Sequence, residues 1–179
     1  DEPLFDRPGL SLFADVLAAN LDTVSAQTIV AGMGENIAFS AGYGKFRTDG
    51  FETDRDLAQY GGNFFAQVRA SDCLYLQTEY VDAKVERGVV NSDFDPLFRS
   101  VFRAEDHSTT TRVGARYEFE PYSLFFINVA AQSFDSKVTD IFGTVQTIGD
   151  AVAGEIQYTF TNETFGLVSG GGHLHATIE

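Results

Sequence analysis

Acidic side chains crowd one stretch of the sequence, TDGFETDRD at residues 48–56, and two histidines stand close together near the other end. Carboxylate and carbonyl oxygens suit Ca²⁺, but the acidic spacing does not fit the EF-hand pattern and is typical of a solvated loop. The histidines are two residues apart and therefore share one face of a strand, yet no third ligand follows at a defined spacing. We predict no metal site and keep six weak candidates: Asp49, Glu52, Asp54, Asp56, His173 and His175.

Hydrolytic chemistry would require a nucleophile beside a base. The three histidines are at positions 107, 173 and 175, and no serine motif such as a nucleophile elbow surrounds any of them. Glu105, Asp106 and His107 form one further patch of ligand-like side chains. We therefore predict that the chain is not an enzyme and that it uses no cofactor.

Charged side chains also alternate with apolar ones. In TRVGARYEFE, residues 111–120, the charged residues fall on one side of a strand, whereas Val113, Ala115, Tyr117 and Phe119 fall on the other. A period of two defines two faces but does not tell which face meets water. The polar positions that share this pattern are Arg69, Glu79, Arg112, Arg116, Glu118, Glu155 and Gln157.

The composition limits the functional classes. A net charge of −14 with only 12 Lys and Arg argues against binding nucleic acid. The 179 residues, 44% of them hydrophobic, suffice for one domain spanning 1–179. No apolar run approaches the roughly 18 to 20 residues that a membrane-spanning helix requires, which leaves strands as the only way to cross a bilayer.

Alternation of this kind recurs along the whole chain and predicts an all-β protein. Tight turns rich in Gly, Asn, Asp and Pro are expected at 33–36, 70–73, 120–123 and 159–163. The nine predicted strands are 10–18, 27–33, 36–47, 62–70, 73–86, 111–120, 123–135, 151–160 and 163–175.

Long polar connections are predicted at 19–26, 48–61, 87–110 and 136–150, so that short and long connections alternate. In an antiparallel up-and-down meander this places short turns on one rim and long loops on the other, as in a transmembrane β-barrel. Aromatic residues beside the turns are typical of the girdle at a membrane interface. Since bacterial single-chain barrels have an even number of strands, nine strands suggest part of a larger barrel.

Several stretches resemble the barrel part of bacterial outer-membrane proteins of the porin and TonB-dependent-receptor kind, and most closely large proteins with tetratricopeptide repeats ahead of a barrel. They are FDRPGLSLFA (5–14), NIAFSAGYGKFRTDGFETDRDLAQYGGNFFAQV (36–68), LQTEYVDAKVERG (76–88), RVGARYEFEPYSLFFINVAAQ (112–132) and EIQYTFTNETFGLVSGGGHLH (155–175). Neither a TonB box nor a plug domain is recognisable. The resemblance implies that small solutes or an exported polymer pass through a pore in the bacterial outer membrane.

A porin-like transport protein would set its selectivity through the polar positions named above, facing the lumen. If the segment DPLFRSVFRAEDH forms a short helix, Leu97, Phe98, Val101 and Phe102 share one face, with Arg99 and Arg103 near the other. Such a helix could fold inward and narrow the pore, or equally pack over a neighbouring loop or contact another subunit. The expected partners are membrane lipid, lipopolysaccharide bridged by divalent cations at the acidic loops, and further copies of the chain.

Two other classes stay open. A soluble secreted or periplasmic β-barrel would turn the Val113 to Phe119 face inward around an apolar ligand and its arginines toward water. A structural subunit of a surface assembly would bury the same face against protein. Extraction that requires detergent separates the membrane barrel from the soluble barrel, and size-exclusion behaviour without detergent separates the assembly subunit.

Overall fold

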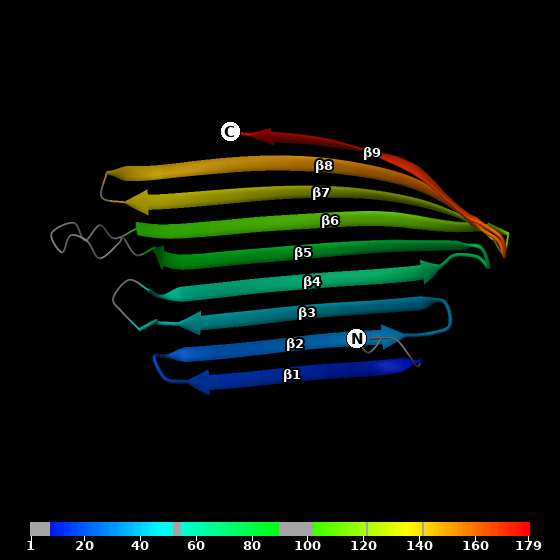
Figure 1. The fold of residues 1–179 in the computed structure, drawn as a ribbon. Coiled ribbons are helices and arrows are strands. Elements are labelled where there is room, and N and C mark those ends of the chain that lie inside the picture. The colour runs from blue at the N-terminus through cyan, green and yellow to red at the C-terminus, as the bar shows by residue number, and fades with distance from the viewer. Residues whose placement is uncertain (1–7, 52–54, 90–101, 121, 141) are drawn as a thin grey trace.

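One antiparallel sheet of nine strands makes up the protein, seen in a computed structural model (Figure 1). The structure describes residues 8–51, 55–89, 102–120, 122–140 and 142–179. The strands follow each other in sequence order, so the predicted all-β meander is confirmed. Their bounds are β1 Gly9–Ala19, β2 Thr23–Met33, β3 Ile37–Thr48, β4 Leu57–Arg69, β5 Leu74–Val89, β6 Phe102–Glu120, β7 Ser123–Asp140, β8 Gly143–Thr161 and β9 Gly166–Ile178.

The sheet is open. β1 and β9 each pair with one neighbour and form its two opposite edges (Figure 1). A closed barrel is therefore not present among the described residues, and the transmembrane barrel predicted above stays a prediction.

The four predicted tight turns all lie at one rim, which we call the short-turn rim (Figure 1). Each joins two strands through at most four residues. In the turn after β8, the Oδ1 of Asn162 accepts hydrogen bonds from the backbone N–H groups of Thr164 and Phe165, both at 2.8 Å. A side chain that imitates the backbone in this way is the reason asparagine is frequent in such turns.

The predicted segregation of loop lengths is wrong for two of the four connections at the opposite rim. The connections expected at 19–26 and 136–150 are the tight turns between β1 and β2 and between β7 and β8. β7 and β8 continue beyond their apolar parts because polar and β-branched residues pair across them, as in Thr139 Oγ1 to Thr144 Oγ1 at 3.0 Å. The other two connections are shorter than predicted, at 49–56 and 90–101.

The turn between β1 and β2 requires a rare backbone conformation. Leu21 and Asp22 have φ of 62° and 49°, and the N–H of Thr23 donates to the carbonyl of Asn20 at 3.3 Å. Two consecutive residues with positive φ match the mirror-image hairpin turn that suits the twist of paired strands. Leucine at such a position is strained, because its Cβ crowds the backbone.

Glycine is also required where β9 meets β8. A Cβ added at Gly170 would lie 2.6 Å from the carbonyl oxygen of Ile156, and one added at Gly172 would lie 2.9 Å from that of Gly154. Both distances are shorter than real Cβ contacts, and the obstructing atoms are backbone. The backbone of β9 can therefore lie this close to that of β8 because these two positions lack side chains.

No second layer covers either side of the sheet in the described residues. The buried hydrophobic residues there are two alanines, Ala31 and Ala104. Large apolar side chains stand in the open instead; Leu10 and Val16, for example, are each 75% exposed. The backbone ladder and contacts between adjacent strands hold the sheet together, and the exposed apolar surface requires a cover. None of the described segments is a helix of the length and hydropathy needed to span a membrane.

We expect Leu21→Gly to stabilise the protein by about 1 kcal/mol, because glycine adopts positive φ without the steric cost that leucine meets. Leu21 is 42% exposed, so little burial is lost. Ala18→Gly, within β1, is the control and should destabilise, since glycine weakens a strand interior. Urea unfolding followed by circular dichroism compares the three proteins, and an equal loss of stability in both variants would contradict the strain.

Candidate functional site on the two faces of the sheet

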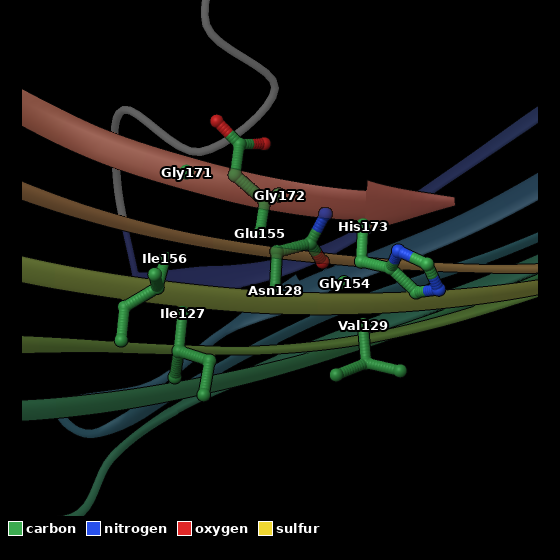
Figure 2. A pocket seen from close by; sticks show the side chains of 9 residues that line it. All are labelled: Ile127, Asn128, Val129, Gly154, Glu155, Ile156, Gly171, Gly172 and His173. Carbon is green, nitrogen blue, oxygen red and sulfur yellow. The ribbon is translucent and has the colours of Figure 1, made fainter. Parts of the chain in front are cut away.

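The strand register sorts every side chain onto one of two faces. Cross-strand partners share a face, so Leu76, Ala115, Ile127 and Ile156 form one row on what we call face A. The adjacent row of Gln77, Gly114, Asn128 and Glu155 belongs to face B. Figure 2 shows this division on β7 and β8, where the side chains of Asn128 and Glu155 point away from those of Ile127, Val129 and Ile156.

All seven polar residues singled out from the sequence lie on face B. β4, β5, β6 and β8 supply them, and their registers put every one of them in phase with Glu155. They occupy the half of the sheet nearer the short-turn rim. The set comprises Arg69, Glu79, Arg112, Arg116, Glu118, Glu155 and Gln157.

Of this set, five charged residues lie on β4, β5 and β6, and four of the five form ion pairs with one another. Arg112 on β6 donates from Nη1 to Oε2 of Glu79 on β5 at 2.9 Å. Arg116 pairs with Glu118, two residues along β6. Arg69 donates instead to Asp72 in the following turn at 2.9 Å. The paired side chains stay between a third and about half exposed, so water reaches this network.

Two residues that were not selected from the sequence contact this group: Tyr75 on face B and Asp72 in the turn between β4 and β5. The guanidinium of Arg116 lies 5.5 Å from the centre of the Tyr75 ring, within the range of a cation–π contact. Asp72 is the partner of Arg69. Tyr75 is in phase with Glu79 along β5, so the alternation could have found it. Asp72 lies in a turn, where no periodicity applies.

On β8, Gln157 donates weakly to Thr159 at 3.4 Å. Glu155 has no hydrogen-bond or ion-pair partner within the described part of the chain. Its cross-strand neighbours on face B are Asn128 and Gly172. Glu155 therefore presents its charge freely on this face.

Face A carries an uncharged band along the same half of the sheet. Its outward positions run from Thr109 to Phe119 on β6, from Phe125 to Ser133 on β7 and from Val152 to Phe160 on β8. Equivalent rows on β3 to β5 hold residues such as Phe39, Phe64 and Leu76. Two neighbouring rows of face A cross the whole sheet without any Asp, Glu, Lys or Arg. They are the row of cross-strand partners of Phe39 and the row of cross-strand partners of Ala41. We call this the apolar band.

Tyrosine and phenylalanine line the band where it meets the short-turn rim. Tyr117 and Phe119 pack edge to face with ring centres 4.6 Å apart, and Phe119 lies 6.5 Å from Phe125. The ring centres of Phe160 and Phe165 lie 5.5 Å apart across the last turn, with the ring planes tilted by 40°. The aromatic grouping predicted around these turns is thus present in the fold.

Beyond the apolar band, face A becomes charged. Lys84 on β5 binds Glu86 at 2.7 Å and lies 3.8 Å from Glu105 on β6. His107 Nε2 is 2.8 Å from the Asp82 carboxylate. Lys45 and Arg47 on β3 and Lys137 on β7 belong to the same rows, as does Asp135, which accepts from Gln146 at 2.9 Å. This charged zone occupies the strand ends toward the rim opposite the short turns.

A shallow hollow of about 360 Å³ opens around the centres of β7, β8 and β9. Gly154 and Gly171 leave space on face A, between Ile127, Val129 and Ile156 on one side and His173 on the other (Figure 2). The walls are almost entirely apolar on this face. Such a surface suits a hydrocarbon chain better than a polar substrate.

Four of the six weak metal candidates lie in the described residues, and these four do not assemble. Asp49 pairs with Arg47, and Asp56 pairs with Arg103, while Glu52 and Asp54 are outside the described residues. His173 and His175 do share face A, as the two-residue spacing predicts. In the described ranges, no three His, Cys, Asp or Glu side chains gather as a metal ion would require.

The patch of Glu105, Asp106 and His107 is divided by the strand. Glu105 and His107 lie on face A, whereas Asp106 lies on face B and accepts from Arg87 at 3.3 Å and from Ser136 at 2.7 Å. Because all three residues belong to β6, alternation separates neighbours that a loop could have brought together.

The predicted pore-narrowing helix falls mostly outside the described residues, which leaves Leu97, Phe98, Arg99 and Val101 without a structural assignment. The prediction is wrong for Phe102 and Arg103, which belong to β6. β6 begins nine residues earlier than predicted because residues 102–110 pair with both β5 and β7.

Glu79 and Arg112 should couple weakly. Because both side chains are partly exposed, a double-mutant cycle with Glu79→Gln and Arg112→Gln is expected to give about 0.2–1 kcal/mol. Salt at about 1 M should remove most of this coupling. The control cycle joins Glu79→Gln to Arg87→Gln, whose partner is Asp106, and should give no coupling. A coupling of several kcal/mol that resists salt would mean that face B is dry.

Comparison of the chain with protein-family models, with curated proteins and with solved structures finds no match. The functional argument therefore depends on the two faces themselves.

Proposed function

We propose that the nine strands are wall strands of a β-barrel in a bacterial outer membrane and that the protein is a porin-like channel or transport protein. Face A would contact hydrocarbon, and face B would line a water-filled lumen. Small solutes or an exported polymer would pass along face B. The strand alternation, the exposed apolar surface and the aromatic rim support this proposal together.

The height of the apolar band is the observation that carries it. The uncharged positions of face A extend over roughly ten residues of β6, β7 and β8, or about 33 Å along the strand. With the tilt of about 40° that barrel strands adopt, this corresponds to about 25 Å across the membrane, the height of the outward apolar band in outer-membrane barrels. β6 and β8 have 19 residues each, so their charged ends would project beyond the bilayer.

The opposite orientation is unfavourable. If face B met the hydrocarbon, Arg112 and Arg116 would each cost about 2–4 kcal/mol near the midplane. Water on both faces is also unfavourable, since exposed side chains such as Leu12, Val113 and Ile156 would then remain uncovered. Lipid on face A and water on face B satisfies both constraints.

The charged zone of face A would lie at the level of the lipid head groups. Lys45, Arg47, Lys84 and Lys137 have the chemistry to bind the phosphates of lipopolysaccharide, and the acidic side chains among them could share its bridging divalent cations. The apolar band and the charged zone would together form one binding surface, which contacts lipid tails along the band and head groups at the charged zone.

The lumen side combines both signs of charge. Arg69, Arg112 and Arg116 face Glu79, Glu118 and Glu155, and Glu155 lacks a partner in the described residues. Rings of such side chains determine which ions and polar solutes pass through a pore. We infer mild selectivity, since the paired charges largely cancel.

Tryptophan introduced on the two faces tests the membrane proposal, because the chain contains no tryptophan of its own. Ile127→Trp lies on face A and Phe126→Trp, its sequence neighbour, lies on face B. In vesicles with brominated lipid tails, the first variant should be strongly quenched and the second should not. Equal quenching, or a chain that stays monodisperse in buffer without detergent, would instead favour a soluble barrel or an assembly subunit.

Ion selectivity tests the lumen. In the complete protein in planar bilayers, Glu155→Gln should raise the permeability of anions relative to cations, and Arg112→Gln should lower it. A unit charge about 5 Å from a passing ion contributes about 0.8 kcal/mol in water, which corresponds to a change of about two- to fourfold. Glu86→Gln, whose side chain lies on face A, is the control and should leave selectivity unchanged. Identical changes in all three variants would contradict the assignment of face B to the lumen.

A further inference from the structure

Both edges of the sheet are suited to further pairing. Natural edge strands are protected by proline, charges or bulges. β1 has one charged residue, Asp15, and no proline, and β9 has neither proline nor any Asp, Glu, Lys or Arg. Within the described residues, each edge therefore leaves the outward-directed backbone N–H and C=O groups of alternate residues unpaired, along 11 residues in β1 and 13 in β9.

Unpaired edges of this kind are energetically unfavourable inside a bilayer. In hydrocarbon no water is available to bind exposed backbone groups, and each unsatisfied group costs several kcal/mol. The apolar band reaches the outermost strand, since Leu10 and Leu12 on face A of β1 are 75% and 70% exposed. At the β1 edge the surface that would meet lipid thus continues without a polar margin, whereas on β9 the face A positions include His173 and His175.

The directions of the edge strands restrict what can pair with them. β1 and β9 both begin at the short-turn rim and run the same way, as their arrows show in Figure 1. Direct closure of β9 onto β1 would therefore be a parallel pair. A second copy inserted in the same orientation would again offer only strands of the same direction, because its own edges are also β1 and β9.

We propose that an odd number of additional strands, from polypeptide beyond β1–β9, pairs antiparallel with both edges and completes the wall. The first of these strands runs opposite to β9 and the last runs opposite to β1. With nine strands present, an odd addition gives the even total found in bacterial single-chain barrels. This inference depends on the proposed membrane location.

Hydrogen exchange in two samples tests the proposal. One is the complete polypeptide in native outer-membrane vesicles, and the other is residues 1–179 in detergent micelles. The outward-directed amides of Gly9–Ala19 and Gly166–Ile178 should exchange slowly in the vesicles and at least 100-fold faster in the micelles. Central strands such as β6 are the internal control and should be protected in the vesicles.

Cysteine cross-linking separates the other ways of covering the edges. In a Cys73→Ser background of the complete protein, Leu12→Cys is combined in turn with Ser169→Cys, His173→Cys and His175→Cys. Cross-links within one chain would show direct closure, and cross-links between chains would show pairing of copies; either overturns the proposal, as does rapid exchange of both edges in the vesicles. If the edges exchange rapidly while Ile127→Trp is still quenched by brominated lipid, the strand inference fails and the membrane proposal stands.

Discussion

Continuous register across the nine strands is the constraint on which the rest of the structure depends. Side chains alternate along each strand, and cross-strand partners share a face, so the environment of one residue determines that of the others. The register shift between Glu118 and Glu120 lies at the end of β6 and leaves the faces of the remaining residues unchanged. If the side chain of Ala115 faces one medium, those of Phe39 on β3 and Ile156 on β8 therefore face the same medium.

Face A changes character along the strands, whereas face B carries charge at both ends. Toward the short-turn rim, face A is apolar and face B carries the arginine and glutamate network. Toward the other rim, face A becomes charged, while face B holds the Arg87–Asp106 ion pair beside Ala83, Ala104 and Phe134. A sheet with the same medium along the whole of face A would have no reason to change that face from apolar to charged. The proposed membrane location would give this reason, since strands that cross a bilayer leave it at the head groups.

The alternation of polar and apolar residues in the sequence predicted those features of the fold that depend on neighbouring residues along one strand. It identified all nine strands, the four turns of the short-turn rim and a common face for the seven polar residues. It failed at strand ends such as 136–140 and 143–150, where Thr, Ser and Lys resemble a loop in composition but pair with the adjacent strand. Contacts such as Arg116 with Tyr75 depend on the register between strands, which periodicity within a single strand does not determine.

Gly170 and Gly172 restrict which substitutions the last strand, β9, can tolerate. Any mutation at Gly170 or Gly172 introduces at least a Cβ, which would meet a carbonyl of β8 rather than a side chain that could turn aside. At Gly32, Gly42 and Gly149 an added Cβ would meet a side chain of a neighbouring strand, whereas a change at Gly170 or Gly172 would separate two backbones along their shared ladder. Natural variation should therefore be almost absent at these two sites even while the side chains around them diverge, and sequences that lack both glycines should have lost this strand pairing altogether.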